Sequence, residues 1–327
     1  MDKEKRQRLG RVELKLAVAR GLRARRRDGI LVGAMLIGAL WTLSIPAAPL
    51  QAQNVAEKED AEEEEADHSE LAKAAQNPLA SLISLPFQNN TSFGIGDDPI
   101  SRTSNVLNIQ PVIPFELSSS FNLITRTILP IVSAPTVDVV DPGDPSLDPG
   151  IGSTTWGLGD LLWTGWFVPT NTGPVMVGVG PALLFPTGTS DDTGTGKWAA
   201  GPSVVFVATP GSALLGFLVN NIWSYAGPSD RGDVNQMVIQ YFINYNLPKG
   251  WYLSSAPIIT ANWEELAGRK WIVPFGGGGG KVFKIGKQPI NSQIQAFYNA
   301  VTPTDNEGDR VGPEWSLRLQ FQLLFPK

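Results

Sequence analysis

The last stretch of the chain, residues 313–327, alternates between apolar and polar side chains. From Trp315 to Phe325 every second residue is apolar, while serine, arginine and glutamine fill positions between them. This period of two is typical of a β-strand with one apolar face. A soluble sandwich would bury that face in its core, whereas a membrane barrel would turn it toward lipid and leave the polar face in a wet lumen. The rest of the chain has to distinguish these two folds.

From residue 87 onward the chain consists of short segments with the composition of strands. Each segment spans roughly 10 to 16 residues, is bounded by Gly, Pro, Asn, Asp or Ser, and is followed by the next without a convincing helix between them. Twelve strands are predicted, at 87–96, 103–116, 120–132, 154–169, 174–187, 197–209, 212–226, 234–247, 250–263, 269–284, 288–302 and 313–326. An even number allows both ends of a membrane barrel to lie on the same side.

The connections between these segments alternate in length. The tight set comprises 118–120, 170–173, 210–211, 248–249 and 286–287. The longer set, richer in Asp and Gly, comprises 133–153, 188–196, 227–233, 264–268 and 303–312. Tryptophans gather near both: Trp198, Trp223, Trp263, Trp271 and Trp315 near long loops, Trp166 and Trp251 beside tight turns. Short turns, long loops and aromatic girdles predict an all-β fold, an antiparallel transmembrane β-barrel of about 12 strands.

Residues 1–52 have the pattern of a secretory signal peptide. A basic block from Arg20 to Arg27 precedes the apolar run Ile30 to Ile45, and small residues follow up to Ala52. We predict cleavage near Ala52 and export to a bacterial outer membrane. The alternative is an inner-membrane anchor, because a spanning helix needs about 20 apolar residues and this run is only slightly shorter.

Charge is distributed unevenly along the chain. The first 52 residues contain 11 of the 26 Lys and Arg residues and 4 of the 31 Asp and Glu residues. The chain after Ala52 therefore carries 15 basic and 27 acidic side chains, a net charge of −12. No nucleic-acid partner is expected, because such proteins concentrate positive charge. With 0 Cys residues, strand pairing and packing must stabilise the exported fold without disulfides.

Residues 53–86 are predicted to form an acidic linker followed by a short amphipathic helix. Nine carboxylates between Glu57 and Glu70 favour a solvated linker or a frayed helix over a metal site. Apolar residues within 71–83 recur at helical spacing around Pro78, which favours a short helix or two half-turns. This segment either caps or partly plugs the barrel at its periplasmic end, or it is a linker helix that packs on nothing.

Two strands show the expected lumen face most clearly. In 288–302 and in 234–247, amide side chains share one phase of the strand and apolar side chains the other. Charges at mid-strand are assigned to the inward phase, since a charge facing lipid there would cost about 2–4 kcal/mol. The candidate lumen-lining residues are Arg126, Asp160, Gln236, Gln240, Asn244, Asn291, Gln293, Gln295, Arg318 and Gln320. The charged ones either line a path or brace the wall as structural ion pairs.

Motifs for chemistry are weak in this chain. The run Gly276 to Gly280 before Lys281 is not a phosphate loop, which would need Ser or Thr where Val282 stands. It indicates a bend, a bulge or a close approach by the N-terminal segment. The acidic loop 138–148 does not match a calcium loop, and the predicted barrel contains no His or Cys to act as base or nucleophile. We therefore expect no catalytic, cofactor-binding or metal site.

Several blocks of the chain resemble a known family. They include NPLASLISLPFQNN, GLGDLLWTGWFVP, YFINYNLPKGWYLSSAPIITANW and LQFQLLFPK. These blocks are similar to bacterial outer-membrane barrels labelled "transporter" or, through a borrowed name, "neuromedin U", and more distantly to the barrel family named for the meta-pathway of phenol degradation. The resemblance spans Asn77 to Lys327, implies a barrel that transports small solutes, and carries over no functional residue. One departure is that Pro326 follows Phe325 where outer-membrane proteins usually end.

The predicted organisation has three parts: a signal peptide at 1–52, the acidic linker and helix at 53–86, and the barrel at 87–327. The predicted function is passive passage of small solutes, and the resemblance implies hydrophobic or aromatic ones. The alternatives are a closed structural or surface-interaction barrel, a soluble exported β-protein and a barrel enzyme. Expected partners are outer-membrane lipid and lipopolysaccharide, the barrel-assembly machinery and the solute, for a monomer without cofactors.

Overall fold

The structure, a computed structural model, describes residues 69–96, 102–135, 154–170, 173–305 and 308–326. All of them belong to the unit Asn54–Lys327. The predicted signal peptide, the linker up to residue 68 and the acidic loop 138–148 lie outside the described residues. In the ranges given above, no helix is both long enough and apolar enough to span a membrane.

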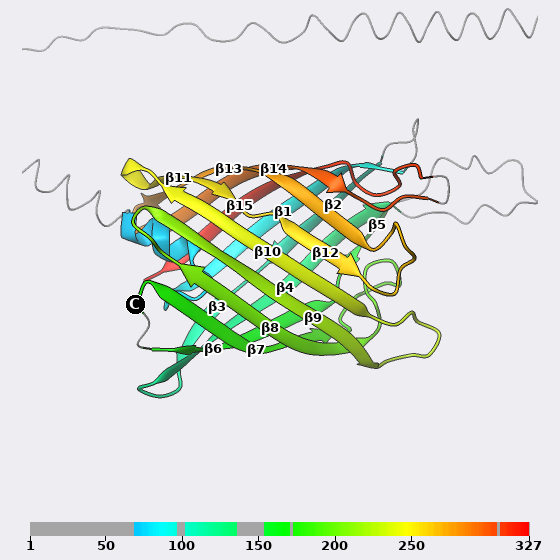
Figure 1. The fold of residues 1–327 in the computed structure, drawn as a ribbon, viewed down its shortest axis with the longest axis horizontal. Helices are drawn as coiled ribbons and strands as arrows, with labels where there is room; N and C mark the ends of the chain where they lie inside the picture. The colour runs from blue at the N-terminus through cyan, green and yellow to red at the C-terminus, as the bar shows by residue number, and fades with distance from the viewer. Residues whose placement is uncertain (1–68, 97–101, 136–153, 171–172, 306–307, 327) are drawn as a thin grey trace, which may run out of the picture. The chain divides into compact units, whose positions relative to one another are not determined.

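Fifteen strands form one antiparallel sheet (Figure 1). They are β1 (Ile83–Ile95), β2 (Arg102–Ile109), β3 (Val112–Glu116), β4 (Phe121–Pro135), β5 (Thr154–Leu158), β6 (Leu161–Pro169), β7 (Val175–Phe185), β8 (Trp198–Ala208), β9 (Ala213–Ala226), β10 (Asn235–Asn246), β11 (Trp251–Ser255), β12 (Ile258–Asn262), β13 (Trp271–Ile285), β14 (Gln288–Val301) and β15 (Trp315–Phe325). A single 3-10 turn, η1 (Pro248–Gly250), separates β10 from β11.

The sheet closes on itself as a barrel. β15 pairs with β1, from Phe325 opposite Ile83 to Trp315 opposite Phe93, so the last strand meets the first. β9 pairs with β10, which closes the other side of the ring. Because β2 and β3, β5 and β6, and β11 and β12 are consecutive pieces of single interrupted strands, the barrel has twelve strands. This confirms the predicted fold class.

The first strand is longer than predicted. β1 begins at Ile83, so residues 83–86 belong to the barrel and not to the predicted linker region. Pro86 obscured this start, since proline usually breaks a strand. In the barrel, Pro86 lies opposite Gln322 in the pairing with β15, and its carbonyl accepts a bond from the Gln110 amide at 2.9 Å. The missing proline N–H therefore leaves the closure intact.

Side chains alternate across the wall in the sense that a membrane barrel requires. On β15, Leu319 and Phe321 are 47% and 41% exposed on the outside, while Arg318, which precedes Leu319, is only 5% exposed. On β14, Ile294 is 53% exposed, while Asn291 and Gln295 are buried. The outside of the wall is thus apolar and the inside carries polar groups, the reverse of a soluble β-sandwich.

Tryptophan placement agrees with the girdle prediction at four residues and contradicts it at one. Trp198, Trp223, Trp251 and Trp315 are exposed on the outer surface, but Trp166 is fully buried inside the barrel. The prediction that Trp166 lies in a girdle was therefore wrong. Trp163 and Trp166 are three residues apart on β6, so they point to opposite faces of the strand, and only one of them can face outward.

The segment that precedes β1 enters the barrel. Residues 69–76 form a helix, and residues 77–82 lead from it into β1; together we call residues 69–82 the inserted segment. Ala72 and Leu82 are buried against Tyr252, Val282 and Leu324 on the inner wall. The Gln76 side chain donates to Asn246 Oδ1 at 2.8 Å, next to the tight turn after β10. Of the two predicted alternatives, a segment that caps or partly plugs the barrel and a helix that packs on nothing, the second is wrong, because this segment packs on the inner wall.

The last glycine of the run in β13, Gly280, lies beneath a tyrosine ring. Tyr252 is paired directly with Gly280, and a Cβ on Gly280 would overlap the Tyr252 ring and hydroxyl. The ring therefore fills the space that a side chain at Gly280 would occupy. Its hydroxyl reaches across to β14 and donates to Asn291 Oδ1 at 2.6 Å. The pairing of the run itself with β14 is regular, and the register shift of β13 lies before it, between Val273 and Pro274.

Candidate functional site

The barrel encloses a cavity of about 280 Å³ next to residues 74–78 of the inserted segment. Inward side chains of β1 to β4, β6, β9 to β12, β14 and β15 line it, so it is the interior of the barrel and not a surface cleft. Its walls combine amides, two arginines and apolar side chains. A space of this size is near the lower end of the roughly 300–1,000 Å³ typical of small-molecule pockets.

One side of the interior is a row of hydrogen-bonded amides, which we call the amide wall. It is formed by inward residues of β1, β14 and β15: Gln88, Asn291, Gln293, Gln295, Gln320 and Gln322. Gln88 Nε2 donates to Gln320 Oε1 at 2.9 Å, and Gln320 Nε2 donates to Gln322 Oε1 at 3.3 Å. Asn291 Nδ2 also donates to Gln322 Oε1, at 2.9 Å. These bonds fix the orientation of the amides that face the cavity.

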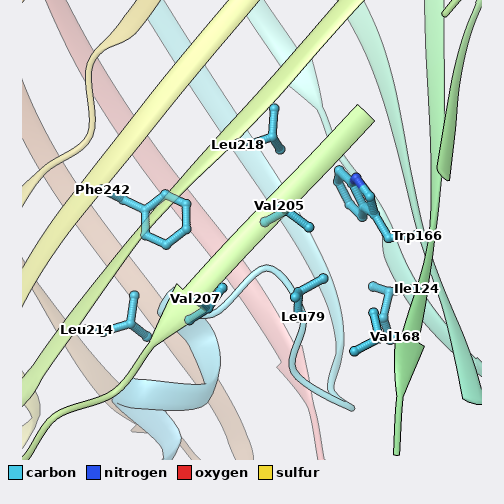
Figure 2. Close-up of a cluster of buried hydrophobic side chains, with 9 residues drawn as sticks. All are labelled: Leu79, Ile124, Trp166, Val168, Val205, Val207, Leu214, Leu218 and Phe242. Atoms are coloured by element: carbon cyan, nitrogen blue, oxygen red, sulfur yellow. The ribbon is translucent and has the colours of Figure 1, made fainter. Parts of the chain in front are cut away.

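The opposite side is hydrocarbon, and we call it the apolar wall. Figure 2 shows its side chains, with Leu79 of the inserted segment among them. The wall consists of Ile124, Trp166, Val168, Val205, Val207, Leu214, Leu218 and Phe242. Leu79 is 3% exposed at this position, so the inserted segment is held by burial of apolar surface as well as by the polar contacts of Gln76.

Arg318 braces the amide wall from β15. Its Nε donates to Asn90 Oδ1 at 2.9 Å, and its Nη1 donates to the Ala256 carbonyl at 2.7 Å. Nη1 also lies 3.5 Å from Gln295 Oε1, and the guanidinium lies 5.1 Å from the Phe297 ring centroid. Arg318 thus joins β15 to β1, to the break between β11 and β12, and to β14. Among the described residues it has no carboxylate partner.

Arg126 on β4 is held differently. Its guanidinium lies 5.5 Å from the Trp166 ring centroid, and its Nε is buried without a hydrogen-bond partner. Trp166 is held in turn by a bond from its Nε1 to Ser203 Oγ at 3.0 Å. Within the described part of the chain, Arg126 has no ion pair. The alternative that the lumen arginines form structural ion pairs is therefore not what the described residues show.

The ten sequence-predicted residues fall into two groups in the structure. Seven line the cavity: Arg126, Gln240, Asn244, Asn291, Gln293, Arg318 and Gln320. Gln295 is buried beside the cavity, where its Nε2 donates to Ser254 Oγ at 2.6 Å. Gln236 is exposed near the end of β10 and lines a separate pocket beside the β12–β13 loop.

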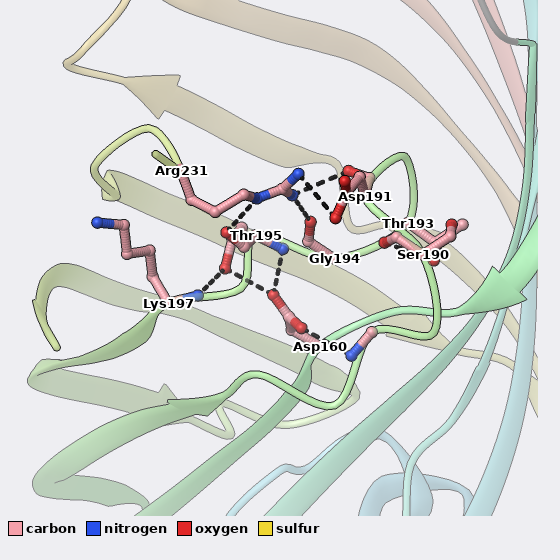
Figure 3. Close-up of polar contacts among 9 residues, drawn as sticks. Asp160, Ser190, Asp191, Thr193, Gly194, Thr195, Lys197 and Arg231 are labelled. Carbon is pink, nitrogen blue, oxygen red and sulfur yellow. Dashed lines mark hydrogen bonds and ion pairs between the residues drawn. The ribbon is translucent and has the colours of Figure 1, made fainter. Parts of the chain in front are cut away.

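Asp160 has a local structural task at the long-loop end (Figure 3). Its Oδ2 accepts bonds from the backbone N–H and the hydroxyl of Thr195, both at 2.6 Å, and its Oδ1 accepts a bond from the Gly188 amide at 2.9 Å. Arg231 holds the same loop through the Thr195 and Gly194 carbonyls and an ion pair with Asp191 at 3.1 Å. Asp160 therefore anchors the β7–β8 loop by binding residues near both of its ends. The inward phase of Asp160 in the sequence did not predict this role.

Several residues of the interior were not predicted. Gln88, Gln110 and Gln322 line the cavity, and the alternation of Ser84, Pro86 and Gln88 could have indicated the first of them. Tyr252 and Trp166 were missed because an aromatic side chain near a strand end fits a girdle equally well. Among the described residues, no group of three or more His, Cys, Asp or Glu side chains could hold a metal ion.

A solved structure of similar fold is an outer membrane channel. The chain resembles the COG4313 outer membrane channel from Pseudomonas putida F1, with a TM-score of 0.54 and 17% sequence identity over 75% of this chain and 94% of that chain. A Pseudomonas aeruginosa FadL homologue aligns with a TM-score of 0.38 and 11% identity over 77% and 91% of the two chains. The CymD monoaromatic hydrocarbon channel aligns with a TM-score of 0.37 and 10% identity over 75% and 88%.

The first of these similarities, at a TM-score of 0.54, shows a shared fold. No family model matches the chain, and no curated protein matches it in sequence. The twelve-stranded barrel with an apolar exterior is therefore shown by its structure to share the fold of an outer-membrane channel.

Proposed function

We propose that this protein is an outer-membrane channel that lets small solutes pass through the barrel by passive diffusion. The observation that carries the proposal is a cavity inside a closed barrel whose outer surface is apolar and whose interior has fixed polar groups. The apolar side chains of such a wall need lipid outside, and its polar side chains need water or solute inside. The segment at 1–52 is proposed to direct export, with cleavage near Ala52.

The cavity's two walls support a solute with both polar and apolar parts. Amides that are already oriented can exchange hydrogen bonds with a polar group. Leu218 and Phe242, the two residues of the apolar wall that line the cavity, can accept hydrocarbon without desolvating any polar group. We propose small molecules with a hydrophobic or aromatic body as the substrate class. This agrees with the hydrophobic or aromatic solutes implied by the sequence resemblance.

One observation favours a second candidate, a barrel without an open path. Leu79 and Ala72 of the inserted segment are almost fully buried in the interior, so this segment fills one end of the barrel. A twelve-stranded barrel lies between small barrels that side chains fill and porins that hold a water channel. Under this reading, the protein has a structural or surface role and conducts nothing.

Conductance of the purified protein in planar bilayers separates the two candidates. Discrete channel openings are expected for the full chain, and larger ones for a variant that lacks residues 69–82. This deletion ends before Ile83 and therefore keeps the β1–β15 pairing that closes the ring. If both proteins show the heat-modifiable gel migration of folded barrels and both remain silent in bilayers, the channel proposal is wrong and the closed barrel stands.

A further inference from the structure

The charged groups that line the cavity are of one sign only. Arg126 and Arg318 contribute two guanidinium groups to its surface, and among the residues that the structure describes no Asp or Glu side chain lines it. The chain after Ala52 has a net charge of −12, so this interior is opposite in sign to the rest of the protein. A positive charge in a space shielded from bulk solvent is costly unless an anion or strong acceptors compensate it.

The two arginines differ in what remains available for a ligand. Arg318 uses its Nε and Nη1 on Asn90, Ala256 and Gln295, so it is mostly committed to bracing the wall. Arg126 makes no hydrogen bond to any described residue, and Trp166 supports the face of its guanidinium at 5.5 Å. A guanidinium whose plane is fixed and whose N–H edges are unused is arranged to bind a planar carboxylate through two parallel bonds.

A second unpartnered polar atom lies beside Arg126. Thr164 is its direct partner in the β4–β6 pairing, and the Thr164 hydroxyl is buried without a hydrogen bond. Thr164 is 1% exposed, so its hydroxyl has little access to bulk water. Two neighbouring polar side chains, each with an unused donor in the interior, point to a bound group that accepts hydrogen bonds.

The surroundings of Arg126 within the cavity favour an organic anion. Ile128 lies two residues along the same inward phase of β4 and is paired with Leu162, and both line the cavity. Leu218 and Phe242 add hydrocarbon from β9 and β10. An inorganic anion would gain nothing from these side chains, whereas the hydrocarbon body of an organic acid would bury apolar surface against them.

We propose that Arg126 is the centre of a binding site for small organic carboxylates with an apolar or aromatic body. The carboxylate accepts two hydrogen bonds from the Arg126 guanidinium, Arg318 adds positive potential, and the body of the ligand lies along the apolar side chains of the cavity. This assignment rests on the proposed function, since it names the class of solute that the interior selects.

Calorimetric titration of the detergent-solubilised full chain with benzoate tests the site without requiring an open pore. Benzamide is the matched neutral probe, because it has the same planar shape and no charge. Benzoate is expected to bind at least tenfold more tightly than benzamide. Equal binding of the two probes, or inorganic phosphate binding as tightly as benzoate, would overturn the assignment of an organic carboxylate site.

Three variants locate the site within the barrel. Arg126→Gln should weaken benzoate binding at least tenfold, and it is expected to fold because Arg126 holds no hydrogen bond in the wall. Arg126→Lys keeps the charge without the planar fork and should give an intermediate affinity. Lys281→Gln is the control, since Lys281 lies over Trp251, outside the set of residues that line the lumen cavity. Unchanged benzoate binding in folded Arg126→Gln would refute the site.

Bilayer measurements keep this inference separate from the channel proposal. If the protein conducts and benzamide crosses, but benzoate binding does not depend on Arg126, the channel stands and the carboxylate site is wrong. If benzoate binding depends on Arg126 while the bilayers stay silent, the site stands and the channel is wrong. Folding of each variant is checked by heat-modifiable migration.

Discussion

The two inner walls of the barrel consist of different side chains and have different roles. The apolar wall is a packed cluster in which Trp166, Val205 and Val207 are fully buried, and Leu79 of the inserted segment completes it. The amide wall is a chain of hydrogen bonds in which Gln88, Gln320 and Gln322 also contact the cavity. One wall resembles the core of a soluble protein, and the other resembles a hydrated surface turned inward.

This difference shows how a barrel of intermediate size can be both stable and hollow. Burial of hydrocarbon on one side contributes packing energy and fixes the inserted segment, while the amides on the other side keep polar groups available without leaving them unsatisfied. Stability should therefore depend strongly on the apolar wall and weakly on the amide wall. Solute passage should show the opposite dependence. The substitutions below test this contrast.

The largest effect is expected for Trp166→Ala in the apolar wall. Trp166 is fully buried, and removing it creates a cavity and leaves Ser203 without its partner. The expected loss is about 3–5 kcal/mol of unfolding free energy. Urea titration of the protein in lipid vesicles, followed by tryptophan fluorescence, measures this loss. Trp163→Ala on the outer face of the same strand is the matched control, and an equal loss there would mean that inward packing is not what stabilises β6.

Sequence reasoning succeeded where the two phases of a strand differ in chemistry. On β14 and β15 the alternation of amides with apolar residues gives both the strand and its orientation, and Gln293, Gln320 and Arg318 all lie at the cavity. The strand count and the existence of a short helix before β1 follow from the same patterns of spacing and turns, whereas the insertion of that helix into the barrel was left open. These are local signals, which a single sequence contains in full.

Sequence reasoning failed where both phases of a strand are apolar. On β8, Val204 faces outward and Val205 inward, and nothing in the composition of that strand separates them. The same ambiguity hid Trp166. Asp160 was placed in the lumen because its phase was inward, but its role depends on Thr195 and Gly188, which only the folded loop brings to it. Contacts between distant segments of this kind have no periodic signal.

A smaller loss of stability, with a gain in conductance, is expected for Leu79→Ala. Leu79 is the residue of the inserted segment that packs into the apolar wall, and its truncation should cost roughly 2–4 kcal/mol. Weaker anchoring should also increase the time that the channel spends open in planar bilayers. Leu266→Ala, at a leucine that is 67% exposed in a loop, should change neither quantity. Lower stability with unchanged gating would show that the inserted segment does not limit passage.

A loss of about 1 kcal/mol is expected for Tyr252→Phe, which removes one hydroxyl that donates a hydrogen bond to the amide wall. The ring would still cover Gly280, so only the bond from the hydroxyl to Asn291 is lost. Tyr245→Phe on the outer face is the control, because Tyr245 is 53% exposed and lies away from the amide wall. Urea titration compares the two variants. A loss as large as that of Trp166→Ala would mean that the amide wall is packed as tightly as the apolar wall.

The smallest change in stability, within about 0.5 kcal/mol, is expected for Gln320→Leu. Gln320 accepts a bond from Gln88 and donates one to Gln322, but it also faces the cavity, so water can replace the lost partner. Passage of a polar solute should fall, because the cavity loses a donor and an acceptor together. Phe321→Leu, at the adjacent outward position, should leave solute passage unchanged. A large loss of stability in Gln320→Leu would mean that water does not reach the amide wall. The contrast between an apolar wall that stabilises the barrel and an amide wall that serves solute passage would then be wrong.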